Sequence, residues 1–106
     1  MISKIIMAPI SEERLTQLIY TVIDELNPNF SDDEKIEKSM DAALFGQNGK
    51  LDSLGLVELM LQIEQKIYDD LNIPVSLAIE NAMSKNENPF KTLGTLHRYI
   101  YHQLNP

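Results

Sequence analysis

The sequence predicts an all-α fold, a small four-helix up-and-down bundle with a long first loop. Apolar residues recur at spacings of three and four in several segments, which is the period of one buried helix face. No segment keeps the strict alternation of a half-buried strand. The 106 residues suffice for one domain with one modest core, and no repeat or linker divides them. We therefore expect a single domain over residues 1–106.

The first helix is expected over about residues 11–26. Ser11 is a good N-cap residue. The helix ends before Pro28, because the residue that precedes a proline avoids the α region. Residues 1–10 are expected to form an extended segment ahead of it. The stripe that this helix buries is Leu15, Leu18, Ile19, Val22, Ile23 and Leu26.

A long connection follows the first helix. Ser31 and Glu34 stand in the spacing of a capping box, which predicts a short helix within residues 31–40. The pairs Phe45-Gly46 and Asn48-Gly49 each indicate a turn, so two turns are expected before the second helix.

The second helix is expected over about residues 53–70, and Pro74 follows its end. It carries two apolar stripes. The core stripe is Leu56, Leu59, Met60, Ile63 and Ile67. The outer stripe is Leu54, Val57 and Leu61, flanked by Glu58 and Glu64. A helix that is covered on one side needs only one stripe. Either the bundle buries this helix from several sides, or the outer stripe is a docking face with an acidic edge.

Two further helices complete the predicted bundle. A short one is expected over about residues 76–83, and a loop through Pro89 separates it from the last one. The last helix is expected over about residues 92–104. Its buried face consists of Leu93, Leu96, Ile100 and Leu104.

Composition excludes several classes of function. The net charge is −7, which argues against nucleic-acid binding and favours a protein partner with a basic face. The chain has no cysteine and therefore no disulfide or thiolate site. Lys4 and Pro9 interrupt the apolar residues of the N-terminal segment, which is then neither a membrane span nor a good signal peptide. We expect a cytoplasmic protein that does not insert into membranes.

One serine is the strongest candidate for chemistry. Ser53 follows Asp52 at the predicted start of the second helix. Unpaired N–H groups and the positive end of the helix dipole favour a phosphate at such a place. The alternative is that Asp52 or Ser53 is only an N-cap.

The residues around Ser53 resemble the phosphopantetheine attachment motif of acyl and peptidyl carrier proteins. The motif is the triplet Asp52-Ser53-Leu54, followed by Val57-Glu58-Leu59 and later by Glu64. The resemblance extends over Ser11 to Leu104 and includes the long first loop and the order of the helices. It implies that Ser53 receives 4′-phosphopantetheine from coenzyme A through a phosphopantetheinyl transferase. The thiol of this arm then carries an acyl or aminoacyl thioester between enzymes.

The same resemblance implies the partners. A loading ligase and a downstream synthase or transferase would act on a monomeric carrier in fatty acid, polyketide or nonribosomal peptide biosynthesis. The expected docking face is Asp52, Leu54, Val57, Glu58, Leu61 and Glu64. The chain departs from the usual fatty-acid carrier at Gly55 and Gln65, where acids are common, and at Leu51. The Leu-Asp-Ser form is more similar to D-alanyl carriers and specialised secondary-metabolism carriers, which leaves the cargo open. Close packing is the default, so we expect no large preformed cavity.

Four rival interpretations are weaker than the carrier, and one of them stays open. A calcium loop with Gly49 at its glycine position needs acidic residues at both ends, where the chain has Leu44 and Gly55. A serine hydrolase needs a nucleophile elbow and a base that the sequence lacks. His97 and His102 are five residues apart, which makes a poor metal pair on one helix. An acidic helical adaptor that is never modified stays open as the alternative to a carrier.

Overall fold

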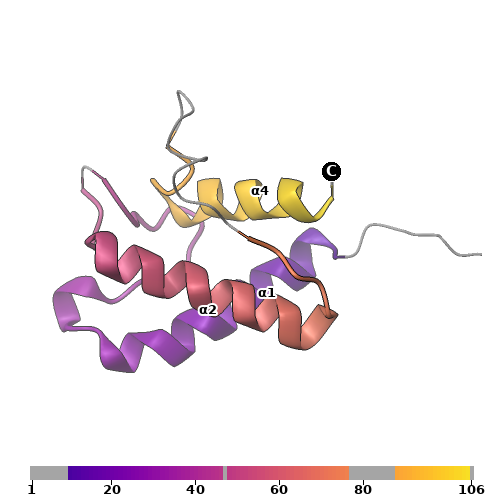
Figure 1. The fold of residues 1–106 in the computed structure, drawn as a ribbon. Coiled ribbons are helices and arrows are strands. Elements are labelled where there is room, and N and C mark those ends of the chain that lie inside the picture. Colours follow the sequence, from indigo (N-terminus) through magenta and orange to yellow (C-terminus); the bar gives the residue numbers. More distant parts are fainter. Residues whose placement is uncertain (1–9, 47, 77–87, 106) are drawn as a thin grey trace, which may run out of the picture.

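The computed structural model describes residues 10–46, 48–76 and 88–105. Within these ranges the fold is all-α, with three α-helices and no strand: α1 (Glu12–Leu26), α2 (Ser53–Leu71) and α4 (Leu93–Leu104). α1 runs in the opposite direction to α2 and α4 and packs against both (Figure 1). The extended segment expected at the N-terminus and the short helix expected over residues 76–83 fall almost entirely outside the described residues.

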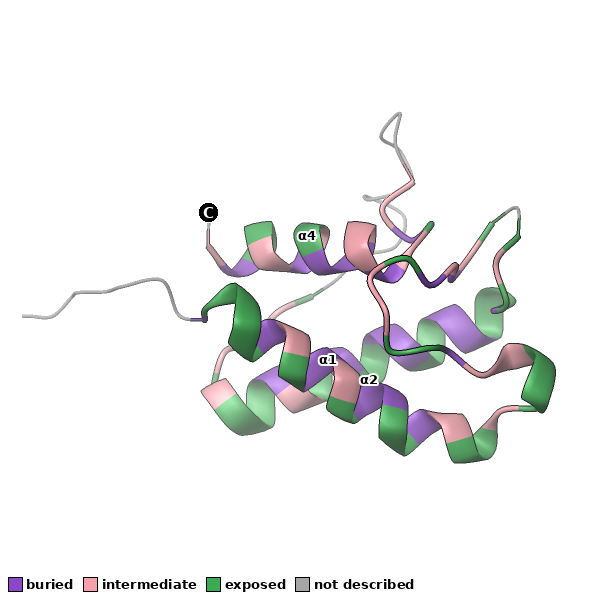
Figure 2. Ribbon diagram, turned by 180° about the vertical axis from the view of Figure 1, so that it is seen from behind, coloured by how far each residue is buried: buried purple, intermediate pink, exposed green. Residues whose placement is uncertain are grey.

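The two long helices pair through their predicted core stripes. All six residues of the α1 stripe and all five of the α2 core stripe are buried, which confirms both assignments. Figure 2 shows the buried positions of the helices turned toward one another. Lys66 of α2 also forms an ion pair with Glu25 of α1 at 3.1 Å. α2 ends at Leu71. Its C-cap is Asn72, a left-handed residue with φ of 60° whose N–H donates to the Tyr68 carbonyl.

α4 begins with a complete capping box. The Thr92 hydroxyl accepts from the Thr95 N–H at 3.1 Å, and the Thr95 hydroxyl accepts from the Thr92 N–H at 3.0 Å. The four apolar residues expected on its inner face are buried, and His97 is buried beside them. Tyr99 packs edge-to-face on Phe90, and burial raises the pKa of its hydroxyl.

The prediction of a short helix within residues 31–40 is wrong. Only a single 3-10 turn forms, over Asp32–Glu34. The side chain of Asn27 binds the backbone of Ile36 twice, accepting from its N–H and donating to its carbonyl, both at 2.9 Å. These bonds take the groups that a helix would use, and they set the Ile36 side chain into the core, where it is 3% exposed.

The second half of the first loop is hydrogen-bonded to the residues at and just before the start of α4. The N–H groups of Leu44 and Phe45 donate to the carbonyls of Lys91 and Phe90, at 2.8 and 3.0 Å. In the other direction, the N–H of Leu93 donates to the Ala42 carbonyl at 2.9 Å. These bonds hold residues 42–45 beside residues 90–93, ahead of the segment that leads into α2.

Candidate functional site

Ser53 is the first residue of α2 and is exposed. Asp52 is the N-cap, and its Oδ1 accepts from the Gly55 N–H at 2.8 Å. Leu51 and Leu56 flank this turn, and both are buried in the manner of a hydrophobic staple. The staple anchors the inner side of the turn in the core. Ser53 lies on the outer side of the turn, where it is accessible from the solvent.

The start of α2 differs from the start of α4 in its free donors. At α4, the N–H groups of Leu93 and Gly94 donate to the first loop and that of Thr95 to the capping box. At α2, the N–H groups of Ser53 and Leu54 have no partner among the described residues. Two donors and the helix dipole are therefore available to an anion beside the Ser53 hydroxyl.

The three residues of the outer stripe lie on the surface. Leu54 is 77% exposed, Val57 40% and Leu61 58%. The alternative that the bundle buries this stripe is therefore wrong for the described residues. Asp52 and Glu58 are exposed and Glu64 is partly exposed, so acidic groups border the stripe as expected. The docking role of these residues stays a prediction.

Tyr68 extends the outer stripe and was not foreseen as part of it. Its side chain is 50% exposed, and it lies seven residues after Leu61 on the same side of α2. The four residues Leu54, Val57, Leu61 and Tyr68 are the large apolar side chains recorded as exposed in the described part of the chain. The heptad spacing from Leu61 was the signal that would have found Tyr68.

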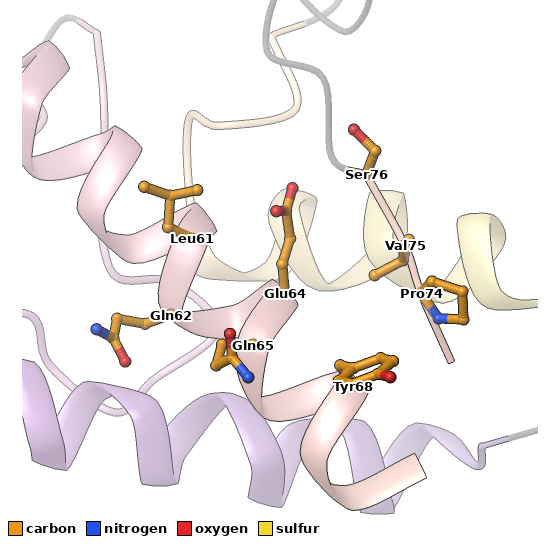
Figure 3. A pocket seen from close by; sticks show the side chains of 8 residues that line it. All are labelled: Leu61, Gln62, Glu64, Gln65, Tyr68, Pro74, Val75 and Ser76. Carbon is orange, nitrogen blue, oxygen red and sulfur yellow. The ribbon is translucent and has the colours of Figure 1, made fainter. Parts of the chain in front are cut away.

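A groove lies at the far end of this stripe from Ser53. It has a volume of about 570 Å³ and is open to solvent (Figure 3). The segment that leaves α2 forms its second wall, with Pro74 opposite the ring of Tyr68. Ser53 is not among the lining residues, which are Leu61, Gln62, Glu64, Gln65, Tyr68, Pro74, Val75 and Ser76.

Gly55 has a packing role that the sequence did not indicate. A Cβ at this position would lie 3.2 Å from Cδ2 of Leu51 and 3.4 Å from Oδ1 of Asp52. The glycine lets Leu51 close over the first turn. The absence of an acid here is thus tied to how the staple packs, beyond its effect on surface charge.

The two histidines have different environments. His97 is 8% exposed, and its Nε2 lies 3.0 Å from the Thr16 hydroxyl and 3.1 Å from the Glu12 carbonyl, both on α1. The Thr16 hydroxyl is placed to donate its proton to that same carbonyl, so it can only accept from His97. We therefore assign Nε2 as the ring nitrogen of His97 that carries the hydrogen. His102 is exposed, although it lines one groove together with His97. The contacts of His97 with Thr16 and Glu12 link α4 to α1. No group of three metal-ligating side chains is found among the described residues.

None of the helices in the described ranges has both the length and the apolar character needed to cross a bilayer. Comparison of the chain with protein-family models, with curated proteins and with solved structures finds no match.

Proposed function

We propose that this chain is a carrier protein whose Ser53 accepts a 4′-phosphopantetheine arm from coenzyme A. The observation that carries the proposal is the exposure of Ser53 at the start of α2, beside two N–H groups that have no partner in the described part of the chain. In the transfer, the Ser53 oxygen bonds to the β-phosphorus of coenzyme A. The bond from that phosphorus to the bridging oxygen breaks, and adenosine 3′,5′-bisphosphate leaves. The hydroxyl proton passes to a base on the transferase.

The geometry suits a substrate of such a transferase better than an enzyme. Among the described residues, no histidine is in hydrogen-bond contact with Ser53. The buried His97 is hydrogen-bonded to α1 instead. A carrier needs only an accessible hydroxyl and a helix end that tolerates the phosphodiester formed on it. Asp52 is engaged as the N-cap through Oδ1, and it holds this helix end in shape.

The outer stripe gives the carrier a surface for its partners. Its apolar residues are exposed, and exposed carboxylates lie beside them at Asp52 and Glu58. A partner with an apolar centre and a basic rim would complement this surface. In this proposal a ligase loads an acyl or aminoacyl group onto the arm as a thioester. A downstream synthase or transferase then takes the group from the cytoplasmic, monomeric carrier.

The unmodified adaptor is supported by one feature of its own. The outer stripe runs on to Tyr68, which lies about 22 Å along the helix from Ser53 at 1.5 Å per residue. A docking surface of that length does not depend on a modified serine at one end. The adaptor and the carrier therefore differ in whether Ser53 is modified, and this is what the experiment must measure.

The test is intact-mass measurement after incubation with coenzyme A and a broad-specificity phosphopantetheinyl transferase. The wild-type chain should gain the mass of one phosphopantetheine group, and Ser53→Ala should gain none. Because Asp52 caps the helix, Ser53→Ala should change the free energy of unfolding by no more than about 0.5 kcal/mol.

Ser31→Ala and Ser76→Ala serve as matched controls, since both serines are exposed and lie outside the motif. Both variants should be modified like the wild type. Modification that persists in Ser53→Ala, or that is lost in either control instead, would exclude the assignment. A wild-type chain that stays unmodified would favour the adaptor.

A further inference from the structure

The loop that leads into α2 closes on itself just before Ser53. The Leu51 N–H donates to the Leu44 carbonyl at 2.9 Å, and the Leu44 N–H donates to the Lys91 carbonyl at 2.8 Å. A continuous series of backbone hydrogen bonds thus links the start of α4 to Leu51. Only Asp52 separates Leu51 from Ser53, so the position of Leu51 limits where the serine lies.

Gly49 lies directly against the peptide that accepts this bond. A Cβ at Gly49 would be 2.7 Å from the Leu44 carbonyl oxygen, and also 2.7 Å from the nitrogen and the Cα of Phe45. Side chains in folded proteins do not make contacts this short. All three atoms belong to the backbone, so no rotamer change relieves the collision. Any residue other than glycine would separate position 49 from the Leu44–Phe45 peptide.

The Leu44–Phe45 side of this contact is the less able to move. Leu44 is fully buried, and the N–H groups of both residues are bound to the start of α4. On the other side, Asn48 and Lys50 are exposed. A side chain at position 49 would therefore displace the segment that continues into Leu51 and Asp52. It would also crowd the carbonyl oxygen to which Leu51 is bound.

From this geometry we propose that Gly49 is a positioning residue for the modification of Ser53, an inference that rests on the proposed carrier function. The close approach at Gly49 holds the Leu51 N–H on the Leu44 carbonyl. That bond places Asp52 where its Oδ1 reaches the Gly55 N–H, and it fixes the first turn of α2 with the Ser53 hydroxyl outward. A displacement of this turn misplaces the attacking oxygen relative to the coenzyme A that the transferase holds.

The test compares transferase kinetics of Gly49→Ala with those of the wild type, using coenzyme A as the donor. We expect kcat/KM for the carrier to fall by about tenfold or more, because misplacement of a reacting atom is costly. KM for coenzyme A should stay the same, since that substrate is bound by the transferase. In amide exchange measured by NMR, the Leu51 and Gly55 N–H groups should lose protection while the helical circular dichroism signal is kept.

Gly94→Ala is the matched control. A Cβ there would lie 3.0 Å from the Met40 carbonyl oxygen, so this substitution also crowds the junction of the first loop with α4. It lies outside the bonds that lead to Leu51. With rates normalised to the folded fraction from thermal melts, Gly94→Ala should be modified at the wild-type rate.

A second variant covers the case in which Gly49→Ala does not fold. Replacement of the Leu51 amide by an ester, through semisynthesis, removes the N–H donor and adds no atom at position 49. It should reproduce the loss in kcat/KM. Wild-type kinetics in this ester or in folded Gly49→Ala, or an equal loss in Gly94→Ala, would overturn the inference while leaving the carrier function intact. A wild-type chain that is never modified would overturn the carrier function itself, and this inference with it.

Discussion

At the scale of single residues, side chains that bind the backbone decide how the first loop runs. Asn27 makes two hydrogen bonds to Ile36, and Ile36 is thereby held with its side chain in the core. We predict that Asn27→Ala lowers the free energy of unfolding by about 1–3 kcal/mol. The reason is that the partly buried N–H and carbonyl of Ile36 both lose their hydrogen-bond partner. Chemical denaturation measures this change.

The control for that prediction is Asn29→Ala, two residues away in the 3-10 turn Asn27–Asn29 that follows α1, and exposed. It should be nearly neutral. Equal stability of the two variants would show that the bonds between Asn27 and Ile36 contribute little.

The residue scale also shows what could be predicted from the sequence and what could not. The sequence predicted an N-cap at Asp52 or Ser53, and the structure assigns it to Asp52, which accepts from the Gly55 N–H three residues later. The bonds between Asn27 and Ile36 span nine residues of irregular chain, so no periodic pattern marks them. The capping-box spacing of Ser31 and Glu34 was misleading, because these side chains bond to each other at the surface.

At the scale of elements, α2 divides into an inner and an outer face with different expected roles. Ile63 on the core stripe is fully buried, whereas Val57 on the outer stripe is 40% exposed. Ile63→Ala should therefore lower the free energy of unfolding by about 2–5 kcal/mol, and Val57→Ala by less than about 1 kcal/mol. If the outer stripe is a docking face, Val57→Ala should slow the modification of Ser53 by shortening the lifetime of the complex with the transferase.

Thermal melts of both variants, together with transferase kinetics on the folded fraction, measure these effects. Val57→Ala should lose kinetic efficiency with little dependence on salt, since it removes apolar contact. If Val57→Ala lowers the melting temperature as much as Ile63→Ala does but is modified at the wild-type rate, Val57 contributes to stability alone.

The elements also differ in how far the sequence specifies them. The limits of α1, α2 and α4 lie within a residue or so of the predicted ones, because caps, prolines and apolar stripes are local signals. The pairing of the first loop with the start of α4 was not foreseen. It joins residues near position 44 to residues near position 91, and neither segment has a regular period. The contact of Gly49 with the Leu44–Phe45 peptide was also not foreseen, because this segment has no regular period either.

At the scale of the whole molecule, the net charge of −7 sets how partners approach. Long-range attraction to a basic partner depends on the total charge, whereas contact at the docking face depends on particular carboxylates. The two effects can be separated by moving the same charge change to different places. Glu58 lies beside the outer stripe, and Glu37 is exposed in the first loop. Replacing either one with lysine removes one negative charge and adds one positive charge, which changes −7 to −5.

We predict that Glu58→Lys slows the modification of Ser53 more than Glu37→Lys does, and most strongly at low ionic strength. The Debye length shortens from about 30 Å at 0.01 M to about 8 Å at 0.15 M salt, so screening weakens the repulsion that the new lysine exerts on a basic partner. The loss should appear mainly in the rate of association, because charges at the edge of an interface act on encounter. The measurement is kcat/KM for the transferase with each variant across a salt series. Equal losses in both variants would mean that only the total charge matters and that the acidic edge of α2 is ordinary surface. A larger loss in Glu58→Lys that disappears as salt is raised would identify that edge as the place where the partner docks.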